Sequence, residues 1–230
     1  MSDVQFDWQR GDRCGGVAEA VLCEGKSTAQ INEIIAQANQ QSVSLLLTRL
    51  GEQPARSLTT NTTHPLHYDA TSRTAILDNG LPEPKPSDAL IVTAGSSDMP
   101  VALEAQRTLR FHGQHVAIIP DCGVAGLWRL TEKLDRLRRA PVIIAVAGME
   151  GALFPVLGGI VPGIVIAVPG STGYGVATGG ATALNTALAS CAPGVVTVNV
   201  DNGFGAAGAM LKILNINKPP SIDSKHPKAG

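Results

Sequence analysis

The feature that most constrains this chain is a long segment almost without charge. Residues 151–200 contain no charged side chain, and residues 141–211 contain two, Glu150 and Asp201. The apolar pieces of this segment are short, β-branched and interrupted by Gly and Pro, whereas a membrane-spanning helix needs roughly 20 continuous apolar residues. Strands of a parallel sheet covered on both faces read as continuous Val and Ile runs, because neither face meets water. The segment therefore predicts a buried parallel sheet and no membrane span.

The composition excludes several classes of partner. The 230 residues have a formal net charge of -1, so the chain has no basic field to attract nucleic acid or an anionic membrane surface. Hydrophobic residues make up 44% and aromatic residues 3%, which favours a core of small aliphatic side chains and excludes intrinsic disorder. The four cysteines are dispersed, and the polar start lacks the apolar core of a signal peptide. We expect a cytoplasmic protein with reduced thiols.

Residues 89–217 alternate between apolar runs and segments compatible with helices. This alternation predicts an α/β domain with a doubly wound parallel sheet. We expect strands at Ala89–Thr93, Val116–Ile119, Val142–Val146, Ile164–Val168 and Val195–Val200, and helices at Pro100–Phe111, Val124–Arg139, Gly151–Gly159, Gly175–Ala189 and Gly203–Leu214.

The rest of the chain differs in kind. Residues 1–77 predict a small α+β extension, residues 78–88 a Pro-rich linker, and residues 218–230 a disordered tail. In the extension, Thr28–Gln40 has the periodicity of an amphipathic helix capped by Ser27 or Thr28. Strands are expected at Ser44–Leu47 and Thr74–Leu77.

The turns after the predicted strands are where ligands bind in an open parallel sheet. After the first strand, Gly95, Ser96 and Ser97 offer backbone amides and hydroxyls at a helix N-terminus, which suits a phosphate. Asp98 suits a ribose hydroxyl or the orientation of a reactive group. The alternative is that Ser97 or Asp98 only caps the helix.

Glu150 and Asp201 each follow an expected buried strand. No Lys or Arg lies near either of them in the sequence, so we expect each carboxylate to be paired, hydrogen-bonded or shifted in its pKa. Such groups are candidate acids or bases. The alternatives are a helix cap for Glu150 and an Asx turn at Asp201.

Two further features are less direct. Cys191 follows a helix and precedes a strand, so it belongs at the amino end of the sheet. There it acts only if the helix is cut short or a neighbouring subunit's site lies nearby, and otherwise it is simply a small apolar residue. Cys122, in a strand-end turn, is better placed by topology. The basic segment from Arg129 to Arg139 predicts a solvated helix face.

Several motifs occur together in this chain, along with an N-terminal pattern of Arg13, Gly15, Glu19, Gly25 and Lys26. Together they resemble the PurE superfamily of aminoimidazole ribonucleotide carboxylases and mutases, and more specifically its LarB branch, over residues 10–215. The motifs are Gly95-Ser96-Ser97-Asp98-Met99-Pro100-Val101, Asp121-Cys122-Gly123-Val124-Ala125-Gly126, Ala147-Gly148-Met149-Glu150-Gly151-Ala152-Leu153, Gly173-Tyr174-Gly175, Ser190-Cys191-Ala192-Pro193-Gly194 and Val200-Asp201-Asn202-Gly203-Phe204-Gly205-Ala206.

The resemblance implies a flavodoxin-like subunit in a homo-octamer. It also implies that nicotinic acid adenine dinucleotide and CO2 or bicarbonate give pyridinium-3,5-biscarboxylic acid mononucleotide and AMP, for synthesis of the nickel-pincer nucleotide. A cysteine matching Cys191 adds to the pyridinium ring, Glu150 removes the ring proton, and Asp98 is a residue of the substrate site. No covalent cofactor is implied, Mg2+ is a candidate, and metal ligands are unknown. The substrate-binding residues expected are Gly95, Ser96, Ser97, Asp121, Gly123, Gly148, Met149, Ser171, Gly173, Tyr174, Asp201, Asn202, Lys26 and Arg13.

The positive charge that two phosphates need must come from outside the uncharged segment. Lys26, Arg13 and Arg49 are the candidates for it.

Two alternatives stay open. A PurE-type aminoimidazole ribonucleotide carboxylase would carry a histidine in the loop after its second strand, and the corresponding loop here begins at Asp121 and has none. A non-catalytic nucleotide-binding module would not require the pair of Cys191 and Glu150.

Overall fold

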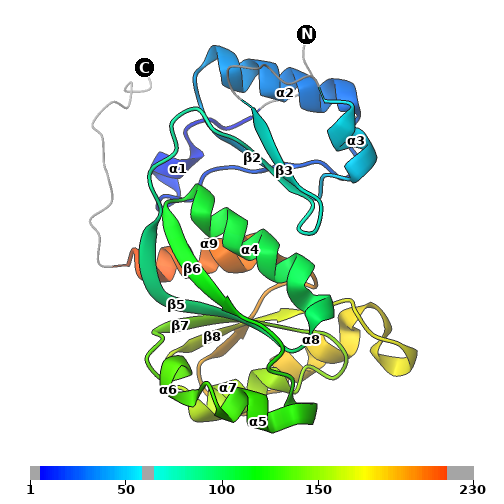
Figure 1. Ribbon diagram of the computed structural model, residues 1–230, viewed down its shortest axis with the longest axis vertical. Coiled ribbons are helices and arrows are strands. Elements are labelled where there is room, and N and C mark those ends of the chain that lie inside the picture. The colour runs from blue at the N-terminus through cyan, green and yellow to red at the C-terminus, as the bar shows by residue number, and fades with distance from the viewer. Residues whose placement is uncertain (1–5, 59–64, 217–230) are drawn as a thin grey trace, which may run out of the picture.

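The computed structural model of the chain describes residues 6–58 and 65–216. These residues form two sheets, each with helices packed on it (Figure 1). The first sheet has four strands and belongs to the N-terminal part, and the second has five strands and belongs to the α/β domain. The predicted disordered tail at 218–230 lies outside the described residues.

The second sheet is wholly parallel, with the strand order β6-β5-β7-β8-β9. In the order of the chain this is 2-1-3-4-5, the flavodoxin-like arrangement, which confirms the predicted fold class. From β5 the chain first adds β6 on one side of β5 and then adds β7 on the other side. The strand order therefore reverses next to β5. Its strands are β5 (Lys85–Thr93), β6 (Gln114–Ile119), β7 (Val142–Ala147), β8 (Ile164–Pro169) and β9 (Val195–Thr197).

Two helix layers cover this sheet and account for the missing charge. In β7, Ile143 and Ala145 pack in the cluster under α5 to α8, whereas Val142, Ile144 and Val146 pack under α4 and α9. Every residue of β7 is buried, so a charged side chain on either face would be cut off from water. The helices are α4 (Met99–Phe111) and α9 (Gly203–Leu214) on one face, and α5 (Leu127–Thr131), α6 (Leu134–Leu137), α7 (Leu153–Ile160) and α8 (Ala181–Leu188) on the other.

The N-terminal part has its own sheet and core. Helix α2 (Thr28–Gln40) begins as predicted at a capping box, in which Ser27 and Gln30 bond each other's backbone amides. It buries an apolar face of Ile and Ala residues against the sheet. The strands, in the order β1-β2-β4-β3, are β1 (Val21–Leu22), β2 (Leu45–Thr48), β4 (Thr74–Leu77) and β3 (Leu66–Asp69), and the short helices are α1 (Arg10–Arg13) and α3 (Glu52–Arg56).

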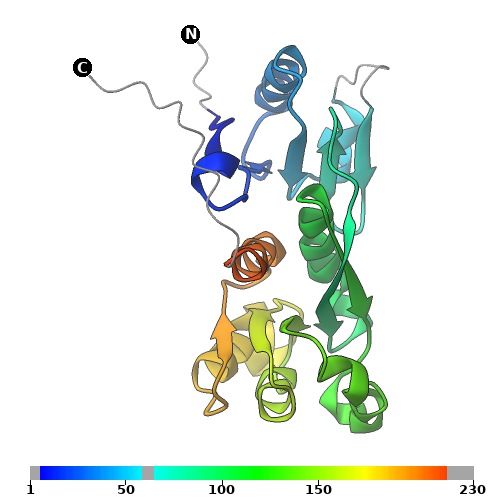
Figure 2. The same ribbon diagram turned by 90° about the vertical axis from the view of Figure 1, so that its left-hand side faces the viewer.

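The N-terminal sheet lies on the α4 and α9 layer of the α/β domain, as both views show (Figures 1 and 2). Leu46, Ile76 and Phe111 form an apolar cluster across this contact, with Phe204 packed against it. Beside the cluster, the Arg107 guanidinium of α4 donates hydrogen bonds to Thr74 Oγ1 at 2.5 Å and to the His67 carbonyl at 2.7 Å. The two parts therefore meet through both apolar packing and specific hydrogen bonds.

Four expected elements have other bounds in the structure. The helix expected at Val124–Arg139 is a 3-10 turn, η2 (Val124–Gly126), followed by α5 and α6, because the backbone leaves the helical region at Lys133 (φ -103°, ψ 2°). The helix expected at Gly175–Ala189 begins with a 3-10 segment, η3 (Gly175–Gly180), whose last two glycines have left-handed φ angles. Strand β5 begins at Lys85, inside the expected linker, and β9 ends at Thr197.

The described helices include none with the length and apolar character needed to cross a membrane.

Candidate functional site

A cleft of about 290 Å³ opens at the carboxyl ends of β5 and β7, where the strand order reverses. This is the position at which open α/β sheets bind ligands. The structure brings eight of the expected site residues together here. They are Gly95, Ser97, Asp98, Asp121, Gly123, Gly148, Met149 and Glu150.

Asp98 is the buried carboxyl group of this cleft. Its side chain is 4% exposed, and its Oδ2 accepts a hydrogen bond from the Gly95 amide at 2.8 Å. Burial raises its pKa from the usual 3.8 and the charge of Asp201 adds to that rise, whereas backbone amides, including that of Gly148, oppose it. Asp98 occupies the N-cap position of α4, but its side chain makes no capping hydrogen bond there. The side chain therefore does not cap α4, and it bonds instead to the amide that precedes the 3-10 turn Ser96–Asp98.

Asp121 forms the second wall of the cleft, together with an arginine that the sequence analysis misplaced. Asp121 has a left-handed backbone (φ 56°), and its Oδ2 lies 2.7 Å from Nη1 of Arg129. A side chain at Gly126 would approach the Arg129 guanidinium to 2.9 Å, so the glycine leaves room for it. The prediction that Arg129 belongs to a solvated helix face was wrong, because Arg129 pairs with Asp121 and lines the cleft.

The turn after β7 is held tightly by the backbone. The Met149 amide donates to the Thr172 carbonyl at 3.0 Å, and Met149 has a left-handed φ of 51°. A Cβ at Gly148 would lie 2.1 Å from the Thr172 carbonyl oxygen, so this position requires glycine. Glu150 is exposed at the rim, and the N-cap of α7 is Ala152. The expectation of a buried carboxylate that needs a partner was therefore wrong for Glu150, and so was the alternative of a helix cap.

The turn after β9 carries Asp201 and Asn202 in different roles. Asp201 Oδ1 accepts a hydrogen bond from the Ser171 amide at 2.8 Å, which ties the turns after β8 and β9 together. The Asn202 side chain accepts from the Gly205 amide at 2.7 Å and so caps α9. The structure thus gives Asn202 a structural role, whereas Asp201 lines a second cleft of about 270 Å³ with Ser171.

Comparisons with known proteins address the whole chain. Residues 1–79 match the LarB/PurE-like N-terminal domain family, and residues 88–226 match the AIR carboxylase family. The chain belongs to the LarB family, within the PurE-like superfamily. An uncharacterized protein of Methanocaldococcus jannaschii is 38% identical over 210 residues, which cover 87% of this chain and 81% of that protein. The family matches support a carboxylase of the PurE and LarB kind.

Two solved structures from Treponema denticola are similar to this LarB family chain. A substituted form of PurE2 is 24% identical, and PurE is 23% identical, each with a TM-score of 0.44. Each comparison covers 58% of this chain and 82% of the other.

Cys191 of this LarB family chain lies apart from the clefts. It is exposed in the loop between α8 and β9, at the amino end of the sheet. Among the four cysteines, Cys122 lies nearer the cleft, but it is buried, and burial raises the pKa of its thiol. A thiol with a raised pKa is a poor nucleophile. The position of Cys122 in a strand-end turn favoured it as a nucleophile, but its buried environment does not.

Other expected residues lie outside the two clefts. Tyr174 is 77% exposed beyond the turn after β8, and Gly173 packs against the Ala177 carbonyl. Arg13 pairs with Asp7 on the N-terminal part. Lys26 is exposed in the turn before α2. Ser96 is exposed in the 3-10 turn next to Ser97 and is not among the residues lining either cleft.

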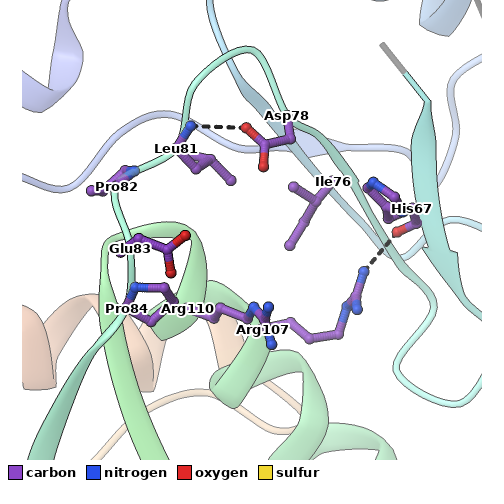
Figure 3. Close-up of a pocket in the computed structure, with 9 residues that line it drawn as sticks. All are labelled: His67, Ile76, Asp78, Leu81, Pro82, Glu83, Pro84, Arg107 and Arg110. Carbon is purple, nitrogen blue, oxygen red and sulfur yellow. Dashed lines mark hydrogen bonds between the residues drawn. The ribbon is translucent and has the colours of Figure 1, made fainter. Parts of the chain in front are cut away.

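A separate cavity of about 390 Å³ lies farther along α4 (Figure 3). It is bounded by the β3–β4 hairpin, the segment after β4 and α4, and the Arg107 hydrogen bond to the His67 carbonyl crosses one side of it. Its charged side chains are of both signs, with Asp78 and Glu83 opposite Arg107 and Arg110. None of the expected site residues lines this cavity, so we place the functional site at the strand ends.

Proposed function

We propose that the chain carboxylates the pyridinium ring of nicotinic acid adenine dinucleotide with CO2 or bicarbonate and hydrolyses the phosphoanhydride. The products are pyridinium-3,5-biscarboxylic acid mononucleotide and AMP, for nickel-pincer nucleotide synthesis. The observation that carries the proposal is that one chain contains both a LarB-type N-terminal domain and a strand-end cleft lined by the buried Asp98. The cleft lining includes no histidine, which disfavours chemistry of the PurE type.

The chemistry needs a nucleophile, because an electron-poor pyridinium cation does not attack CO2. In the proposed reaction the Cys191 thiolate adds to the ring and converts it into an enamine-like adduct. The adduct carbon attacks CO2 and forms the new C–C bond. A carboxylate then removes the proton from that carbon, and departure of the thiolate restores the aromatic ring.

Asp98 is better placed than Glu150 to take this proton. Asp98 is buried, burial raises its pKa above the usual 3.8, and the residue lines the cleft. Glu150 lies on the exposed rim of the same cleft. We assign Asp98 the proton transfer in the cleft, and Glu150 a second proton transfer at the rim.

Cys191 reaches such a cleft only from another subunit, since it lies at the amino end of its own sheet. Large apolar side chains beside it are exposed, including Leu188 at 66% and Val196 at 50%. Exposed apolar groups of this size are typical of surfaces that assemble. They support a homo-oligomer, which we propose to be an octamer with sites shared between subunits.

Mg2+ has no evident position in this scheme. The part of the chain that the structure describes has no group of three or more His, Cys, Asp and Glu side chains arranged to hold a metal ion.

Incubation of the full chain with nicotinic acid adenine dinucleotide and bicarbonate tests the proposal. We expect AMP and the dicarboxylated mononucleotide in equal amounts, and no turnover of aminoimidazole ribonucleotide. Turnover of the imidazole nucleotide instead would indicate a PurE-type carboxylase. Ligand-induced stabilisation without product would indicate a nucleotide-binding module.

A further inference from the structure

The two clefts at the strand ends adjoin each other, and we treat them together as one groove. Ser97 and Thr172 line both of them, so the space around Asp98 extends past these residues toward the N-terminal part. On that side the groove is bounded by residues 71–73, in the turn between β3 and β4, and by Arg49, which directly follows β2. A ligand longer than a mononucleotide would therefore pass from the α/β domain onto the N-terminal sheet.

The charges along this groove are unevenly distributed. The inner cleft is lined by three carboxyl groups, from Asp98, Asp121 and Glu150, and by one cation, Arg129. Arg129 is already engaged by Asp121. The two phosphates of a dinucleotide each carry a negative charge, and the one cation of the inner cleft is shared with Asp121. The outer cleft is lined by two cations, Arg49 and Arg73, and by two carboxyl groups, those of Glu104 and Asp201.

Backbone contacts hold these two arginines side by side. The Leu50 amide donates to the Arg73 carbonyl at 2.8 Å, and the Arg73 Nη2 donates to the Arg49 carbonyl at 3.4 Å. Arg49 in turn donates from Nη2 to the Asp201 carbonyl at 3.1 Å, which fixes it over the strand-end turns. Both arginines have left-handed backbones, with φ angles of 51° and 53°, a conformation that non-glycine residues adopt rarely.

Acidic groups also face Arg49. Glu24 lies 3.4 Å from its Nη1, and buried Glu104 lies beside it, with its own pKa raised by burial. Arg73 differs, because the ion pairs among the described residues do not include it and its side chain is exposed in the groove. Arg73 is therefore the cation with the most charge left for a ligand, and Arg49 is the one held most firmly.

We propose that Arg49 and Arg73 form the subsite for the phosphoanhydride and distal nucleotide of the substrate. This inference rests on the proposed function, which supplies the dinucleotide. It gives the N-terminal part a specific role, because that part selects a dinucleotide over a mononucleotide while the inner cleft holds the ring. Guanidinium groups suit this role because they form charge-assisted hydrogen bonds with phosphate oxygens.

Calorimetric titration of the full chain with two probes tests the subsite. The probes are nicotinic acid adenine dinucleotide and nicotinic acid mononucleotide, and the variants are Arg73→Gln and the double variant Arg49→Gln/Arg73→Gln. Arg56→Gln is the matched control, since Arg56 lies in the same N-terminal part, pairs with Glu52 and lines neither cleft. Thermal unfolding of each variant verifies folding, and Arg73→Gln alone decides the matter if loss of the Asp201 contact unfolds the double variant.

The wild type is expected to bind the dinucleotide more tightly than the mononucleotide. Loss of charged hydrogen bonds should weaken dinucleotide binding about 10-fold in Arg73→Gln and about 100-fold in the double variant. Mononucleotide binding should weaken less in both, because that probe carries one phosphate and no distal nucleotide, and Arg56→Gln should match the wild type. Equal wild-type affinity for the two probes, no binding of the dinucleotide, unchanged dinucleotide affinity in the variants, or equal weakening of both probes would overturn the subsite.

The outcome also separates the subsite from the proposed function. If the wild-type chain discriminates between the probes through the two arginines but releases no AMP, the subsite holds and the proposed carboxylase function is contradicted. If the wild-type chain forms both products and the variants bind the dinucleotide as tightly as the wild type does, the carboxylase function holds and the subsite is contradicted.

Discussion

The Arg49 guanidinium donates a 3.1 Å hydrogen bond to the carbonyl oxygen of Asp201, 152 residues farther along the chain. This contact joins the end of β2 in the N-terminal sheet to the turn after β9 in the α/β domain. Beside it, the buried Glu104 carboxylate of α4 accepts hydrogen bonds from the Thr48 side chain and from the Phe204 amide, the latter at 3.3 Å. The contact between the two parts is thus polar where it faces the groove and apolar behind it, so the position of the N-terminal sheet and the shape of the strand-end turns depend on one another.

Replacement of Asp98 by Asn should change the pH dependence of the free energy of unfolding and should also lower the activity. Burial raises the pKa of Asp98 above 3.8, so the native state binds this proton more tightly than the unfolded chain does. The stabilising contribution is present below pH 3.8 and is lost as the pH rises through the raised native pKa. The free energy of unfolding of the wild type, relative to Asp98→Asn, should therefore fall from acid to neutral pH.

Urea unfolding of both proteins across a pH series measures this difference. Carboxylation by Asp98→Asn should fall by about 100-fold or more, because the proton acceptor is gone. Asp135→Asn, on exposed helix α6, should change neither quantity. A stability difference that does not vary with pH would show that the Asp98 pKa is not raised.

His112 should make the protein less stable in acid. Its Nε2 accepts the Ala18 amide at 3.0 Å, so the proton of the neutral ring lies on Nδ1, 2.8 Å from the Thr108 carbonyl. Burial lowers the pKa of His112 below 6.5, so the native state resists protonation. The stability it confers is complete above pH 6.5 and is lost as the pH falls through the lowered native pKa.

Melting temperatures of His112→Gln and the wild type near neutral and mildly acidic pH test this. Gln keeps an acceptor for Ala18 without a titrating ring, so the variant should lose less stability in acid than the wild type does. His115→Gln is the control, because His115 is exposed. An equal acid loss in His112→Gln and the wild type would contradict the assignment.

Asn202 should behave as a helix cap. Its Oδ1 accepts the Gly205 amide at 2.7 Å at the start of α9. Asn202→Ala should therefore lower the free energy of unfolding by about 1 kcal/mol, and Asn202→Asp, which keeps an acceptor oxygen, by only about a few tenths of that. Urea unfolding measures both. Equal destabilisation by the two replacements would show that capping is not its role.

Cys191 should act across a subunit boundary. Cys191→Ala and Asp98→Asn should each be inactive, whereas co-assembly of the two variants from denaturant should restore about a quarter of the wild-type activity, because some sites then combine both native residues. Activity of the mixture relative to each variant refolded alone is the measurement. A mixture as inactive as its components would place both residues in one subunit's site.

The buried parts of the fold were predictable from the sequence because burial leaves a clear pattern. The uncharged, β-branched run at Val142–Ala147 indicated a strand covered on both faces, and the spacing of Ile31, Ile34 and Ile35 indicated helix α2. Strand β3 (Leu66–Asp69) was missed because it is only four residues long and only partly buried, although Leu66 and Tyr68 alternate with polar residues and pack on the core. A run this short gives the apolar–polar alternation too few positions to stand out in the sequence.

The candidate site was predictable only for the residues that directly follow strands of the parallel sheet. Asp98 and Glu150 follow strands whose ends meet, so topology alone brings them together. Arg73 and Arg129 were missed as site residues, because their positions depend on a turn between β3 and β4 and on an ion pair in the cleft. Arg49 was suggested only by the need for positive charge. Long-range placement of exposed cations leaves no local pattern in the sequence.

The most direct test of the central claim follows carbon from bicarbonate into the pyridinium ring. The full chain is incubated with nicotinic acid adenine dinucleotide and 13C-labelled bicarbonate, and the products are analysed by mass spectrometry and carbon NMR. The account predicts one labelled carboxylate bonded to a ring carbon for each AMP released, and no label in the products of Asp98→Asn or Cys191→Ala. AMP release without ring-bound label, or label incorporated equally well by Cys191→Ala, would contradict it.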